Sequence, residues 1–175
     1  TAGVRLQSPP THQTQYSNEE SDMKMIQTMS MAFGFRVPVY PKISGSSSAK
    51  AVLNNLVRNP YAGGLLIDGI DGGTGAAYNV SMDATGHPIA SNLRECYQDL
   101  VRQGRQNEIP LFAAGGIGKN GNVTQNGMAL IMLGASGVWV GTRFIATPEA
   151  RAVIGYKDKL LAATEDATVV SRAYT

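Results

Sequence analysis

From residue 36 onward, short apolar runs and segments with apolar residues at helical spacing follow one another in a regular order. Four short apolar runs, typical of strands, lie in residues 36–44, 64–70, 109–114 and 137–142. Segments with apolar residues at helical spacing follow the runs, at residues 48–57, 93–101, 128–133 and from Thr147 onward. The pattern therefore predicts four strand–helix units in succession.

The first 35 residues lack this order, and we treat them as a separate segment from residues 36–175. Residues 1–22 are polar and predict an arm or loop. Residues 23–35 carry methionines and phenylalanines at near-helical spacing, which predicts a helix or loop that fills the core. The chain starts at Thr1 and shows no signal peptide, so we expect it to be processed or part of something longer.

Successive strand–helix units imply parallel strands joined by right-handed crossovers. The runs are apolar throughout, as expected for strands that are covered on both faces. Two architectures fit this pattern, an open doubly wound sheet and part of a (β/α)₈ TIM barrel. A full barrel needs about 250 residues, so four units would be about half of one.

The composition of the chain argues against several classes of partner and ligand. The 175 residues carry 15 basic and 13 acidic side chains, a net charge of +2, which argues against nucleic acid or an anionic membrane as the main partner. No apolar run approaches the roughly 20 residues of a membrane span. Cys96 is the one cysteine, so we expect no internal disulfide, no metal site and a reducing, cytoplasmic location.

Glycine follows each of the last three predicted strands. The segments are Asp71-Gly72-Gly73-Thr74-Gly75, Ala114-Gly115-Gly116-Ile117-Gly118 and Gly141-Thr142. Glycine lets backbone N–H groups approach an anion closely, and the carboxyl ends of parallel strands meet at one edge of a sheet. The sequence therefore predicts a phosphate site there, with ordinary turn chemistry as the alternative.

Three stretches, "PLFAAGGIG", "ALIMLGASGVWVGTRFIATPEA" and "YKDKLLAATEDATVVSRAYT", resemble the nitronate monooxygenase (2-nitropropane dioxygenase) family. The resemblance covers residues 36–175 and is strongest over residues 109–144. It implies a (β/α)₈ barrel that holds FMN, of which this chain supplies about the last four βα units. It also implies that the phosphate of FMN binds the backbone amides of Gly115, Gly116, Gly141 and Thr142.

One loop departs from that family. Nitronate monooxygenases usually carry a catalytic histidine after strand six, whereas this loop has none and resembles that of the glutamate synthase FMN barrel. The resemblance implies that Gly72, Gly73 and Thr74 lie at the cofactor. The iron–sulfur cysteines of that enzyme are missing, so we do not expect its mode of electron delivery. We expect His87, beyond the loop, and His12, in the polar arm, to be surface residues.

Four other residues are candidates for chemistry or packing. Lys42, which ends the first predicted strand, would lie beside the flavin N1–C2=O edge as in several FMN barrels, or emerge into solvent. Asp68 and Asp71 would bind ribityl hydroxyls or substrate, or act as caps. Arg143 would neutralise phosphate or form a scaffold salt bridge. The candidate catalytic residues are Lys42 and Asp71, and Trp139 is expected to pack.

The resulting expectation is an FMN-dependent oxidoreductase or monooxygenase of nitronate-monooxygenase type that acts on a small molecule. A glutamate-synthase-like or enoyl-reductase-like flavoprotein is the second interpretation. The third is a non-catalytic flavin- or phosphate-binding subunit of a larger complex. In each case we expect an oligomer, or a partner that supplies the N-terminal half barrel from the same precursor or another chain.

Overall fold

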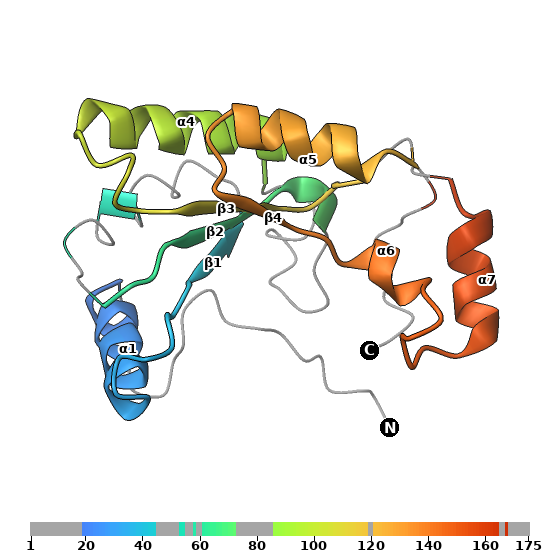
Figure 1. Ribbon diagram of the computed structural model, residues 1–175, viewed down its shortest axis with the longest axis horizontal. Coiled ribbons are helices and arrows are strands. Elements are labelled where there is room, and N and C mark those ends of the chain that lie inside the picture. The colour runs from blue at the N-terminus through green and yellow to red at the C-terminus, as the bar shows by residue number, and fades with distance from the viewer. Residues whose placement is uncertain are drawn as a thin grey trace, which may run out of the picture.

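A parallel four-stranded sheet forms the centre of the computed structural model, which describes residues 19–44, 53–54, 58, 61–72, 86–118, 121–164 and 167. The strands lie in sequence order as neighbours in the sheet (Figure 1). Their bounds are β1 Lys42–Ser44, β2 Leu65–Asp68, β3 Leu111–Ala114 and β4 Gly137–Trp139. The four predicted strands are therefore present and parallel.

The order of the strands decides between the two architectures. Helix α4 (Ile89–Arg102) joins β2 to β3, and α5 (Val123–Met132) joins β3 to β4. Both helices cover the same face of the sheet (Figure 1). A doubly wound sheet reverses its strand order and carries helices on both faces. The sheet is instead singly wound, as a TIM barrel is, and the predicted fold class is confirmed.

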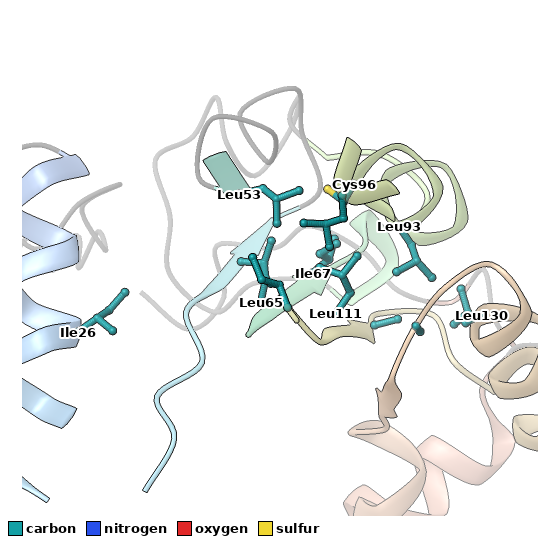
Figure 2. Packing of buried hydrophobic residues seen from close by; sticks show 12 residues of the cluster. Ile26, Leu53, Leu65, Ile67, Leu93, Cys96, Leu111 and Leu130 are labelled. Carbon is teal, nitrogen blue, oxygen red and sulfur yellow. The ribbon is translucent and has the colours of Figure 1, made fainter. Parts of the chain in front are cut away.

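Alternate residues of the strands build the core between sheet and helices (Figure 2). Leu65 and Ile67 of β2 lie in register with Leu111 and Ala113 of β3 and face the helices. They pack against residues that the helical spacing predicted, namely Leu93, Cys96 and Leu100 of α4, joined by Leu130 of α5. Burying a side chain of this size contributes about 1.5–3 kcal/mol, so this layer holds the helices on the sheet.

The opposite face of the sheet carries the other set of alternate residues. Asp68, Ala114 and Trp139 lie side by side at its carboxyl edge. Phe112 lies one step deeper and meets Tyr40 edge to face, with ring centroids 5.1 Å apart. In a barrel this face is the interior. Trp139 was expected to pack, but it is 55% exposed because no described element covers this face.

The N-terminal segment differs from the prediction in two ways. Helix α1 spans Glu19–Ala32, so the predicted polar loop ends four residues earlier than expected. Acidic residues at the start of a helix are favoured by its dipole, and this overrides the lack of an apolar pattern there. The described methionine side chains do not form the core there, because Met29 and Met31 are exposed, Met25 is half-buried, and Ile26 is the residue of α1 in the core cluster.

Several element ends also differ. The run at residues 36–44 narrows to β1, so Lys42 begins this strand rather than ending it. Ile70 leaves β2 for the short 3-10 helix η1 (Ile70–Gly72). Thr147 caps no helix, since its hydroxyl donates to the Phe144 carbonyl at 2.9 Å behind α6 (Thr142–Ile145). The last helix, α7, spans Ile154–Ala162. Most of the helix expected at residues 48–57 lies outside the described residues.

These exposed edges and faces generate a prediction about the isolated 175-residue chain. Within the described part, β1 and β4 are open strand edges, and large apolar side chains such as Met132 (84% exposed) and Ile154 (77%) face solvent. Open edges and apolar patches favour association. We expect light scattering to show oligomers or aggregates. A monodisperse, stably folded monomer of 18.5 kDa would contradict this.

Candidate functional site

The carboxyl edge of the sheet gathers the loops that follow β2, β3 and β4. In TIM barrels this edge carries the functional groups. Within the described residues it brings together η1, α6 and the loop after β3, of which residues 115–118 and 121 are described. The predicted site residues Gly72, Gly115, Gly116, Gly141 and Thr142 belong to these segments. Gly73 and Thr74 lie outside the described residues.

Lys42 and Asp68 form an ion pair at the β1–β2 end of this edge. The Lys42 Nζ lies 2.9 Å from Asp68 Oδ2. The Lys42 side chain is 59% exposed and that of Asp68 is 17% exposed. Lys42 therefore has both an acidic partner and contact with solvent. An ion pair this open adds little stability, so its main consequence is to hold an ammonium group in place at the mouth of the site.

Two carboxylates lie against glycines of the neighbouring loops. A Cβ atom on Gly72 would collide with Asp68 Oδ1, and one on Gly115 would lie 2.9 Å from the same oxygen. A Cβ on Gly116 would lie 2.9 Å from Asp71 Oδ2. Asp68 is thus enclosed by the loops after β2 and β3. The glycines are needed here for space as well as for conformation, since Gly116 has φ +69°.

Arg143 lies at the other end of the edge, between the loops after β3 and β4. Its Nη2 donates to the Gly121 carbonyl at 2.9 Å, and its Nε lies 4.0 Å from where a Cβ on Gly118 would be. No carboxylate of the described residues pairs with it, so the predicted scaffold salt bridge is not found there. Gly141 is open, because nothing lies within 4 Å of a Cβ at that position.

His87 occupies the segment just before α4. Its side chain is exposed, as predicted. Its carbonyl accepts the Ile70 N–H at 3.1 Å, which ties this segment to η1. The spacing of residues in the sequence could not show that His87 lies beside η1, because this placement depends on a hydrogen bond between distant segments. His12 lies outside the described residues.

The described part of the chain has neither a cluster of metal-binding side chains nor a helix suited to crossing a membrane. No three His, Cys, Asp or Glu side chains there come together as a metal site would require. None of its helices combines the length and the apolar character that crossing a membrane would demand.

A singly wound parallel sheet with glycine-rich loops at its carboxyl edge defines a barrel-type α/β protein. Residues 1–153 match the family model described as the conserved region in glutamate synthase, and the chain belongs to that family. The matched range includes residues 1–35, for which no resemblance had been expected. The second resemblance named above, to glutamate synthase, therefore fits better than the first.

Individual relatives agree with this assignment. The archaeal glutamate synthase [NADPH] of Methanocaldococcus jannaschii is 34% identical over 135 residues, which are 77% of this chain and 25% of the relative. The chain thus spans about a quarter of the length of that curated relative. A nitronate monooxygenase of Metarhizium robertsii is 44% identical, but over 68 residues, which are 38% of this chain and 18% of the relative. The expected membership of an enzyme family is confirmed.

A solved structure supports the fold alone. FabK from Thermotoga maritima superposes with a TM-score of 0.60 at 22% identity, covering 81% of this chain and 39% of FabK. The likeness extends over most of the chain, so the four strands and the described helices are arranged as part of that larger fold.

The glycine contacts predict different effects of two substitutions on stability. Gly116→Ala places a Cβ at positive φ and against Asp71, so we expect a loss of about 1–3 kcal/mol in the free energy of unfolding. Gly141→Ala meets open space at φ −103°, so we expect a change within about 0.5 kcal/mol. Urea melts of both variants in the flavin-free protein check this. Equal losses would show that the Gly116 contact with Asp71 is not maintained.

Proposed function

We propose that this chain is the phosphate-binding part of an FMN-dependent oxidoreductase barrel within a larger enzyme of glutamate-synthase type. The observation that carries the proposal is the order of charges along the carboxyl edge of the sheet. Two carboxylates and Lys42 lie at the β1–β2 end, and Arg143 with its glycine loop lies at the β3–β4 end. A ligand that is anionic at one end and hydroxylated in the middle matches this order.

The order of charges supports one orientation of FMN at this edge. The phosphate lies at the β3–β4 end, on the amides of the loop that begins at Gly115 and Gly116 and on those of Gly141 and Thr142. The carboxylates of Asp68 and Asp71 are acceptors for the ribityl hydroxyls. The ring then extends toward Lys42, whose ammonium lies near its N1–C2=O edge.

The chain's own residues supply position and electrostatics. Bound FMN provides the electron exchange with a small-molecule substrate. Lys42 places a positive charge where the reduced cofactor carries negative charge, and this favours reduction. Asp68 fixes the ammonium at 2.9 Å and offsets part of its charge. Leu66 and Phe112, on the same face one step deeper, keep the floor of the site apolar.

A second candidate function is oxidation of alkyl nitronates. The 44% identity to the nitronate monooxygenase favours it, although the match covers 38% of the chain. Glutamate formation with NADPH, measured on the full-length protein, supports the glutamate-synthase type. Bleaching and reoxidation of the flavin with nitronates, without glutamate formation, would support the second candidate. Flavin that neither treatment bleaches would indicate a binding subunit without turnover.

Trp139 offers a direct test of cofactor binding. It is the one tryptophan of this chain and lies half exposed at the carboxyl edge, in register with Ala114 and Asp68. We expect the purified protein to absorb as a flavoprotein, and FMN added to the stripped protein to quench the Trp139 emission. The emission of Trp139 is obtained by subtracting the emission of the Trp139→Phe variant from that of the wild type. A colourless protein with no quenching would contradict the proposal.

Substitution of Lys42 tests the orientation of the ring. In Lys42→Met the cation is gone, so we expect the reduction potential of the bound flavin to fall. Lys159→Met, an exposed position on α7, is the matched control and should leave the potential unchanged. Potentiometric titration measures both. A Lys42→Met potential equal to that of the wild type would place Lys42 away from the ring.

A further inference from the structure

Arg143 is the described cation that reaches both loops at the β3–β4 end. It is the second residue of α6, and its guanidinium extends across to the loop after β3. There Nη2 donates to the Gly121 carbonyl at 2.9 Å and lies 3.9 Å from where a Cβ on Gly121 would be. A side chain on Gly118 or Gly121 would therefore approach the guanidinium. The backbone holds this group in place without neutralising it.

Among the described residues, the hydrogen bonds of Arg143 leave most of its donors available. A guanidinium has five N–H donors in a planar fork, which suits the oxygens of a phosphate. One acceptor for them lies among the described residues, and it is the uncharged carbonyl of Gly121. The side chain is exposed at the same edge as Gly141, where no neighbour crowds the backbone. This combination of fixed charge, free donors and open space suits an anion.

The opposite end of the loop is electrically different. A Cβ on Gly115 would lie 2.9 Å from Asp68 Oδ1, and one on Gly116 would lie 2.9 Å from Asp71 Oδ2. Lys42 offsets part of the charge of Asp68, but the two carboxylates still disfavour an anion close to them, whereas Arg143 favours one near Gly118, Gly121 and Gly141. Backbone amides alone would not distinguish the two ends. The arginine therefore decides where along the edge a phosphate is held.

We propose that Arg143 recognises the phosphate group of the flavin and so makes the site select FMN over riboflavin. The inference rests on the proposed function, since it assumes that a flavin binds at this edge. The guanidinium contacts the phosphate oxygens directly and keeps the loop after β3 joined to α6. Riboflavin, which has no phosphate, gains nothing from this residue.

The test compares the dissociation constants of FMN and riboflavin for the full-length protein and its Arg143→Gln variant. We expect Arg143→Gln to weaken FMN binding roughly ten- to a hundredfold, the range for hydrogen bonds to a charged group. Riboflavin binding should not change. Arg143→Lys keeps the charge but lacks the planar fork of donors, so its affinity for FMN should lie between that of the wild type and that of Arg143→Gln. Arg151→Gln, an equal change of charge at an exposed position, is the control.

The possible outcomes separate the two proposals. Unchanged FMN binding in Arg143→Gln, or an equal loss for FMN and riboflavin, would overturn the role of Arg143 while flavin binding stands. A wild-type protein that binds neither flavin would overturn the proposed function and this inference together. If Arg143→Gln does not fold, the selectivity ratio of Arg143→Lys decides, and a ratio equal to that of the wild type contradicts the inference.

Discussion

The placement of both described crossover helices on one face of the sheet is the constraint on which the remaining structure depends. Each strand then divides its residues between two environments by simple alternation. Leu65 and Ile67 face the helices and are fully buried, while Leu66 and Asp68 face the other way. The same alternation on β4 sends Val138 to the core and Trp139 to the open face. The chemical groups of the site are therefore a by-product of how the core is packed.

Much of this arrangement could be predicted from the sequence. Apolar runs located the four strands, and helical spacing identified Leu93, Cys96 and Leu100 as core residues. Glycines after the strands indicated the edge of the sheet at which the candidate site lies. These features are local or periodic, so a linear pattern carries them. The choice between a barrel and a doubly wound sheet needed strand order, which periodicity does not encode.

Other features depend on contacts between segments distant in the sequence. Trp139 was expected to pack because apolar residues flank it, but its exposure reflects the lack of a described neighbour on that face. Lys42 pairs with Asp68 across 26 positions, and Arg143 reaches Gly121 across 22. The family was similarly difficult to assign, because the most recognisable motifs occupy residues 109–144, whereas the glutamate synthase match extends over residues 1–153.

The contacts between carboxylates and glycines have a consequence for how such a sequence can diverge. Asp68 occupies the space that side chains at Gly72 and Gly115 would need, and Asp71 does the same for Gly116. Mutational drift at these five positions is therefore coupled rather than independent. A larger residue can enter at position 72 if Asp68 is first shortened, so the order of those two changes matters. At Gly115 the Gly69 carbonyl oxygen lies closer still to the Cβ position, at 2.7 Å, so shortening Asp68 alone would not make room. The loops after β2 and β3 would then evolve as one unit, slower than their exposure alone suggests.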